Sequence, residues 1–225
     1  MRMTRISVTQ YFSTIIRSLN ERLATLCSET DSLFISGTFQ AVEDPERPFS
    51  LLSHITRDGA HFNLEGYAVL GQAIVDDLRA WGVKPGSRVL LVGDSITAGY
   101  PEYEPLLLGL NYGDEEHSFG YHIRTLLNCD VVNCGISGDH TSSMVTRLAT
   151  HLQVRPDVVI LQGGANDAFM SMEMGSGQVT SEMADKITDT IFKNFRDMVE
   201  ECKDGGYRCA VLPLLPFYGE FMQGE

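Results

Sequence analysis

The sequence has few basic residues. Its 225 residues include 17 Lys and Arg against 30 Asp and Glu, which gives a formal net charge of −13. Proteins that bind nucleic acid or an anionic membrane surface gather Lys and Arg into patches, and no such patch occurs along this chain. We therefore expect neither nucleic acid nor an anionic membrane as a partner.

Long apolar runs are absent as well. No segment approaches the ~18 apolar residues that a membrane-spanning helix requires, so we expect no stable membrane insertion. The first residues, MRMTRISVTQYFSTIIRSLNERL, have early positive charge but neither an apolar core nor a small-residue cleavage site. They do not resemble a signal peptide, and the sequence predicts a cytoplasmic protein.

Cysteine is scarce, and its spacing does not match a metal site. The chain has five cysteines, an odd number, at positions 27, 129, 134, 202 and 209. Without an export signal, free thiols in a reducing cytoplasm are the expectation. The sequence calls for no metal and no cofactor.

What the chain does contain is an alternation of strands and helices. Short apolar, β-branched runs predict strands at 87–93, 130–136, 157–164 and 207–215, with a weaker candidate at 32–39. Apolar residues at three- and four-residue spacing predict helices at 8–27, 63–81, 118–127, 141–151 and 181–202. This alternation predicts one α/β domain, residues 1–225: a three-layer α/β/α sandwich with a five-stranded parallel, flavodoxin-like sheet.

Three predicted strands are each followed by a residue suited to ester chemistry. Ser95, in VLLVGDSITAGY, places a hydroxyl at the carboxyl edge of the sheet, although it can equally cap the next helix. Gly138 can turn its N–H toward an anion, or be a plain turn glycine. Asn166 can donate its amide to an oxyanion, or be a turn asparagine. Asp167 is predicted to be a structural hydrogen-bonding partner.

A fourth motif, DGAHFNLEGY, contains a potential acid–base pair. A turn can bring the carboxylate of Asp58 to Nδ1 of His61, which leaves Nε2 free as a base. Asn63 then starts a helix, and Gly66 permits close packing. The other histidines are predicted to be structural, with the role of His140 left open because it adjoins the Gly138 turn.

Together these motifs, from about Ile6 to Pro216, resemble those of the SGNH or GDSL hydrolases. The resemblance implies a serine esterase that hydrolyses a carboxylic ester of a small molecule without a cofactor. Sugar O-acetylesterase, thioesterase and lysophospholipase activities are alternatives within the same fold. A noncatalytic binding module of that fold is the alternative from another class. The sequence does not predict the oligomeric state.

The resemblance also assigns roles to single residues. It implies Ser95 as nucleophile, His61 as base and Asp58 as the residue that orients His61. It implies an oxyanion hole formed by the backbone amides of Ser95 and Gly138 and the side chain of Asn166. Each of these roles is an expectation that requires the side chains to converge at one edge of the sheet.

The order of the motifs departs from the family. In the family the serine opens the domain and the Asp-x-x-His pair closes it, whereas Asp58 and His61 precede Ser95 here. Circular permutation explains this order, with 1–82 as the usual C-terminal part and 87–225 as the usual N-terminal part. The alternative is a fragment that spans two tandem hydrolase domains and needs a partner.

Substrate specificity is expected to depend on segments that follow the strands. Segments 100–117 and 168–180 and the two termini are predicted to border the site, because open α/β sheets bind ligands beyond the carboxyl ends of their strands. Met170, Met172 and Met174 can form an adaptable acyl-binding surface or pack onto the core.

Overall fold

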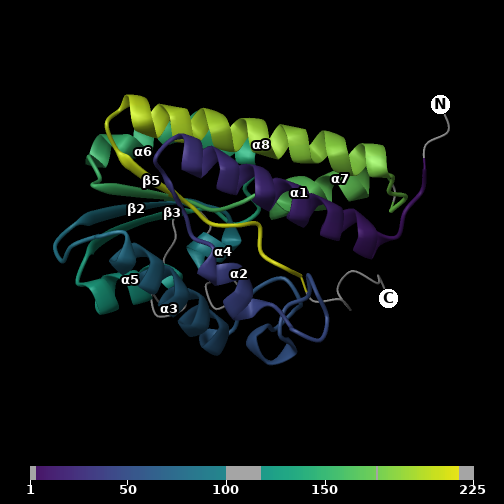
Figure 1. Cartoon of the computed structure of the whole chain (residues 1–225), viewed down its shortest axis with the longest axis horizontal. Coiled ribbons are helices and arrows are strands. Elements are labelled where there is room, and N and C mark those ends of the chain that lie inside the picture. Colours follow the sequence, from purple (N-terminus) through teal and green to yellow (C-terminus); the bar gives the residue numbers. More distant parts are fainter. Residues whose placement is uncertain (1–3, 100–117, 176, 218–225) are drawn as a thin grey trace.

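The computed structural model describes residues 4–99, 118–175 and 177–217, and its centre is a five-stranded, fully parallel sheet (Figure 1). The strands are β1 Leu33–Phe34, β2 Arg88–Gly93, β3 Asp130–Gly135, β4 Val158–Leu161 and β5 Arg208–Val211. Their spatial order is β1-β5-β4-β2-β3. Numbered as a ring that starts at β2, this order becomes 2-1-3-4-5, the flavodoxin-like order.

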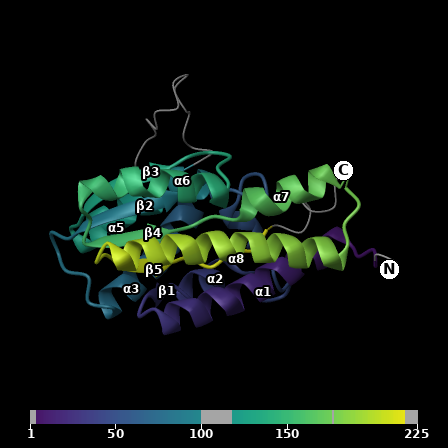
Figure 2. The same cartoon turned by 90° about the horizontal axis from the view of Figure 1, so that it is seen from above.

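Helices cover both faces of the sheet (Figures 1 and 2). One face has α1 Val8–Glu29, α6 Thr141–His151 and α8 Ser181–Asp204, and the other has α2 Gly37–Val42, α3 Leu64–Ala80 and α5 Phe119–Leu127. The shorter helices are α4 Ser95–Ala98, α7 Ala165–Met174 and the 3₁₀ turns η1 Ser53–Ile55 and η3 Leu152–Val154. The three-layer α/β/α prediction is therefore confirmed.

Alternating strand residues divide the interior into two cores. Along β2, Leu90 and Val92 pack into the core under α1, α6 and α8, whereas Val89 and Leu91 pack into the core over α3 and α5. Successive side chains of a strand point to opposite faces, and helices cover both faces of β2, so all of these side chains are buried. This arrangement explains why the central strands are continuous apolar runs in the sequence.

Polar residues fix where the long helices begin. Ser7 and Gln10 form a reciprocal capping box at the start of α1. The side chains of Asn63, Ser118 and Thr180 cap α3, α5 and α8, each accepting a hydrogen bond from a backbone N–H of the first turn. These caps place the predicted helix starts within a residue or two of their observed positions.

Two helices, α2 and α7, lie where the sequence predicted no helix. The segment 38–57 includes most of α2, which begins at Gly37 and shortens β1 to two residues. The segment 168–180 includes most of α7, since ANDAFMSMEM has no Gly or Pro before the C-cap at Gly175. Segment 100–117 lies outside the described residues, as do most residues of the two termini. Within the described ranges, no helix is both long and apolar enough to span a bilayer.

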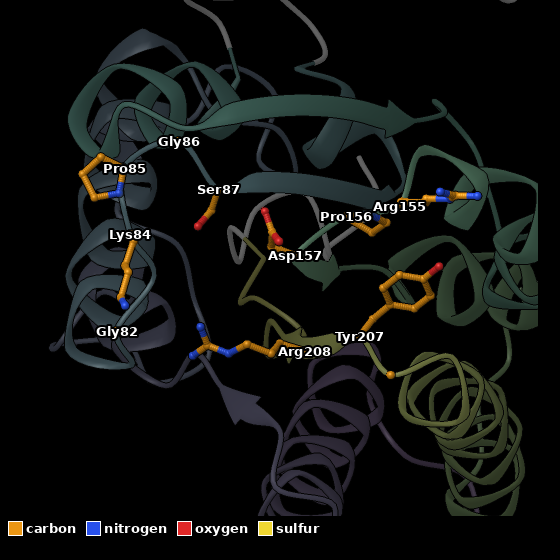
Figure 3. A pocket seen from close by; sticks show the side chains of 11 residues that line it. Gly82, Lys84, Pro85, Gly86, Ser87, Arg155, Pro156, Asp157, Tyr207 and Arg208 are labelled. Carbon is orange, nitrogen blue, oxygen red and sulfur yellow. The ribbon is translucent and has the colours of Figure 1, made fainter.

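The connection between α3 and β2 packs against the amino edge of the sheet. The guanidinium carbon of Arg208 lies 3.8 Å from the centroid of the Trp81 ring, and Nη2 donates to the Trp81 carbonyl at 2.7 Å. A hollow of about 770 Å³ opens beside this connection (Figure 3). Its lining is Gly82, Lys84, Pro85, Gly86, Ser87, Arg155, Pro156, Asp157, Gly206, Tyr207 and Arg208. None of the predicted site residues is among them.

Candidate active site

Ser95 lies in the tight turn that follows β2. Asp94 caps the short helix α4, because its Oδ1 accepts a hydrogen bond from the backbone N–H of Ile96 at 2.9 Å. A Cβ at Gly93 would overlap the hydroxyl of Thr97, so only glycine allows the strand to turn this closely. Ser95 is therefore held at the carboxyl edge of the sheet, 7% exposed.

The Asp58 and His61 side chains complete a hydrogen-bonded chain to this serine. Oδ2 of Asp58 lies 2.6 Å from Nδ1 of His61, and Nε2 of His61 lies 3.0 Å from Oγ of Ser95. Oδ1 of Asp58 accepts from the backbone N–H groups of Ala60 and His61, at 2.9 and 2.8 Å. Both carboxylate oxygens are therefore fixed within one turn.

The protonation state of Asp58 determines the tautomer of His61. Burial raises the pKa of Asp58, but hydrogen bonds from the His61 side chain and from the backbone of His61 and Ala60 outweigh it and hold the pKa at about 2. Asp58 is consequently ionised at neutral pH and can only accept hydrogen bonds. Nδ1 of a neutral His61 must carry the proton, and Nε2 then presents its lone pair to Ser95.

The start of α3 anchors the Asp58–His61 turn. Oδ1 of Asn63 accepts from the N–H of Gly66 at 2.9 Å, and its Nδ2 donates to the carbonyl of His54 at 2.8 Å. A Cβ at Gly66 would overlap the Ile55 carbonyl and the Phe62 ring. The predicted roles of Asn63 in starting the helix and of Gly66 in close packing are both confirmed.

Gly138 lies on the loop between β3 and α6, and Asn166 lies in the first turn of α7. Gly138 has a φ of +78°, and within the described residues no heavy atom outside the glycine and its two neighbours lies within 4 Å of the position that a Cβ would take. Nδ2 of Asn166 donates to the carbonyl of Asp139, the residue after Gly138, at 2.9 Å. Asp167 accepts from the N–H and hydroxyl of Thr141, at 3.0 and 2.7 Å, which confirms its structural role.

The loop that contains Gly138 leaves the sheet beside the Ser95 turn. Gly93 and Gly135 pair in register at the ends of β2 and β3. The N–H of Ile136 donates to the Gly93 carbonyl at 2.9 Å, and a Cβ at Gly135 would overlap the backbone of Ala98 in α4. Strand register therefore brings the Gly138 loop to the same sheet edge as Ser95.

An apolar hollow of about 660 Å³ lies between the start of α6, α7 and α8. Its lining is His140, Ser142, Asp167, Met170, Ser171, Met174, Gly175, Met183, Lys186, Ile187 and Thr190. Nε2 of His140 is buried there without a hydrogen-bond partner among the described residues. Of the three methionines singled out from the sequence, Met170 and Met174 line the hollow, and Met172 packs partly buried against the core.

Asp94, the residue before Ser95, is buried, and no role was predicted for it from the sequence. Its carboxyl is buried, and Oδ2 has no hydrogen-bond partner among the described residues. Burial raises the pKa of Asp94 to about 6, although the hydrogen bond from the Ile96 N–H opposes the rise. The signal was available in the sequence, since Asp94 stands between the buried strand and Ser95.

We expect Asp94→Asn to stabilise the protein more at high pH than at low pH. The pKa of Asp94 rises from an ordinary value of 3.8 to about 6 on folding, so its ionisation opposes folding increasingly as pH rises between these values. Asparagine keeps the acceptor for Ile96 and cannot ionise. Thermal unfolding of both proteins at pH 4 and pH 7.5 measures the difference. A melting-temperature difference that does not change with pH would contradict the burial of an ionised carboxylate.

The family relationship follows from a sequence comparison with known families. The profile of the GDSL-like lipase/acylhydrolase family matches residues 91–224, more than half of the chain. The chain belongs to this family. The matched range contains Ser95, Gly138 and Asn166, whereas Asp58 and His61 lie before it.

Solved structures of related proteins are similar in part. A lipolytic protein of the G-D-S-L family from Desulfitobacterium hafniense is 20% identical with a TM-score of 0.45, covering 61% of this chain and 66% of that one. A catalytic mutant of Axe2, an acetylxylan esterase from Geobacillus stearothermophilus, is 22% identical with a TM-score of 0.38, covering 58% and 60%. AlinE4, an SGNH-hydrolase family esterase, is 20% identical with a TM-score of 0.39, also covering 58% and 60%.

The chain therefore spans less than two thirds of the length of each of these proteins. No curated protein sequence matches the chain.

Proposed function

We propose that the chain hydrolyses carboxylic esters with Ser95 as nucleophile, His61 as base and Asp58 as the group that orients His61. The observation that carries this proposal is the unbroken chain of contacts from Asp58 Oδ2 through both ring nitrogens of His61 to Ser95 Oγ, at 2.6 and 3.0 Å. A nucleophile, a base and an orienting acid at hydrogen-bond distance are the requirements for acyl transfer through a serine.

Each step uses a group in this chain. Nε2 of His61 takes the proton of Ser95 as Oγ attacks the ester carbonyl, and the acyl–serine forms when the alcohol leaves with that proton. His61 then removes a proton from water as the water oxygen attacks the acyl–serine, and it returns that proton to Oγ of Ser95 when the acid leaves. Asp58 stays ionised and stabilises the imidazolium that forms in both halves of the reaction.

The oxyanion is proposed to accept hydrogen bonds from the backbone N–H groups of Ser95 and Gly138 and from Nδ2 of Asn166. One N–H of the Asn166 amide donates to the Asp139 carbonyl. The second N–H remains for the oxyanion, since an amide nitrogen has two protons. The positive φ of Gly138 and the space that the described residues leave open beside it support room for a ligand.

Asn166→Ala is expected to lower kcat by about 10²–10³-fold, which is the usual cost of removing one oxyanion donor. The Michaelis constant should change little, because the oxyanion forms only in the transition state. Asn20→Ala is a matched control: Asn20 also bonds backbone groups, those of Leu214. Steady-state kinetics of the three proteins decide the matter, and a change confined to the Michaelis constant would mean that Asn166 is a structural turn residue.

We also propose that the described residues form a single permuted hydrolase domain. The sheet order read as a ring from β2 supports it, as does the packed joint between α3 and β2. The alternative is a piece of two tandem domains, in which triads form between two copies. Sedimentation at several concentrations tests this. The permuted domain predicts an active monomer with constant turnover per chain, whereas activity that is present only in a dimer would contradict it.

The acyl group of the substrate is proposed to have an apolar chain. The hollow lined by Met170 and Met174 supports this, because methionine adapts to flexible apolar ligands. Acetylated sugars, thioesters and lysophospholipids are the competing substrates, and a binding module would hydrolyse none of them. A panel of esters that varies acyl length and alcohol, run on wild type and Ser95→Ala, separates these outcomes.

A further inference from the structure

Arg147 links several segments at the carboxyl edge of the sheet. It lies on α6, which packs against β2 on one face of the sheet (Figure 2). Its Nε donates to Oδ2 of Asp139 at 2.8 Å, its Nη1 to the Cys134 carbonyl at 2.7 Å and its Nη2 to the Gly93 carbonyl at 2.9 Å. All three nitrogens of the guanidinium are thus bound to groups that face this edge.

Two of these acceptors adjoin residues proposed to act in the reaction. The Gly93 carbonyl lies two residues before Ser95 in the turn that presents the nucleophile. Asp139 follows Gly138 directly, and its own carbonyl accepts the amide of Asn166 at 2.9 Å. One guanidinium therefore connects the segment of the proposed nucleophile with the Gly138 loop and, through Asp139, with Asn166 at the start of α7.

Asp139 also stabilises the loop through two hydrogen bonds within it. Oδ1 of Asp139 accepts from the backbone N–H of His140 at 3.1 Å, and the backbone N–H of Asp139 donates to the Ile136 carbonyl at 3.1 Å. The Gly93 carbonyl that receives Arg147 also receives the N–H of Ile136. Two contacts therefore connect the loop from Ile136 to His140 with the end of β2. One is the direct hydrogen bond from Ile136 to Gly93, and the other is the bridge from Asp139 through Arg147 to Gly93.

The charge and burial of the Arg147–Asp139 ion pair indicate that it positions the loop rather than adding charge to the site. The side chains of Arg147 and Asp139 are 15% and 8% exposed, so neither ion is well solvated. A buried ion pair contributes little net stability compared with apolar packing, but its bonds have strict directions. Because Asp139 neutralises Arg147, the pair presents little net charge to a developing oxyanion.

We propose that Arg147 is a positioning residue that holds Gly138 and Asn166 at a fixed place relative to Ser95. The inference rests on the proposed esterase function. Without the guanidinium, the loop from Ile136 to His140 loses its bond to β2 through Asp139. The proposed oxyanion donors then shift. The free energy of the transition state rises, whereas that of substrate binding stays nearly unchanged.

Arg147→Met tests this, with Arg88→Met as the matched control. Arg88 also bonds a carboxylate and a backbone carbonyl, Asp130 and Val154, but at the opposite edge of the sheet. Arg147→Met is expected to lower kcat by about 10²-fold, the usual cost of a displacement of about 1 Å, with the Michaelis constant near its wild-type value. Arg88→Met is expected to keep the wild-type kcat, whatever its melting temperature.

Arg147→Lys keeps the proposal testable if the methionine variant does not fold. Lysine retains the charge beside Asp139 but lacks the planar fork that reaches both carbonyls, so its kcat is expected to lie between those of wild type and Arg147→Met. Wild-type kcat in the variants that fold, or an equal loss in Arg88→Met, would overturn the positioning role.

A crystal structure of the folded Arg147 variant separates this inference from the proposed function. If the wild-type protein hydrolyses no ester, the proposed function is wrong. The positioning role of Arg147 is then tested by comparing the loop in the variant structure with that in the wild type. Displacement of Gly138 and loss of the Asn166–Asp139 hydrogen bond would support it. An unchanged loop would overturn it.

Discussion

Replacing Ser95 with alanine is expected to remove nearly all ester hydrolysis, and His61→Ala should cost almost as much. Serine and histidine act as one unit, so removal of either lowers kcat by about 10⁶-fold and the double variant is hardly worse than each single one. The physical reason is the 3.0 Å contact from Nε2 of His61 to Oγ of Ser95, which neither group can replace alone.

Two substitutions serve as controls for these variants. Ser143→Ala changes an exposed serine on α6, and His54→Ala changes an exposed histidine near the Asp58–His61 turn. Both are expected to keep wild-type kcat. Steady-state kinetics, with far-ultraviolet circular dichroism to establish folding, give the comparison. If folded Ser95→Ala or His61→Ala kept more than a small fraction of turnover, the assignment of the triad would be wrong.

Asp58→Asn is expected to lower kcat by about 10⁴-fold, less than the loss of the serine or histidine. Asparagine fills the same space, but it has no charge to stabilise the imidazolium and can hold His61 in the wrong tautomer. Binding should change little, because Asp58 bonds His61 and not the substrate.

The control for this substitution is Asp76→Asn, which neutralises an exposed carboxylate on α3. The pKa of about 2 predicts that Asp58 stays ionised throughout the pH range in which ester hydrolysis is assayed. The loss in Asp58→Asn should therefore persist from pH 5 to pH 8. Wild-type kcat in this variant would show that another group holds the imidazole.

The convergence of Asp58, His61 and Ser95 could be predicted from the sequence because these residues adjoin recognisable elements. The apolar runs before Ser95 and Asn166 are buried on both faces, and such runs identify central strands without knowledge of their neighbours. Since all strands are parallel, their carboxyl ends meet at one edge, which predicts that the residues after them converge. The contact between His61 and Ser95 agrees with that expectation.

The features that the sequence did not predict depend on long-range contacts. Arg147 lies in a helix that was predicted, but its bond to Gly93 joins residues 54 positions apart. The raised pKa of Asp94 likewise results from burial by segments distant in sequence. Helix α2 was missed because it is short, and the two-residue β1 has too little of its own pattern to fix its length.

Covalent labelling with a fluorophosphonate tests the central claim most directly. Such reagents phosphonylate a serine that a neighbouring base has activated, and mass spectrometry of the digested protein locates the adduct. The account predicts an adduct on Ser95 in wild type, its absence in Ser95→Ala and much slower labelling in His61→Ala. Ester hydrolysis by a chain that is labelled elsewhere, or not at all, would contradict it.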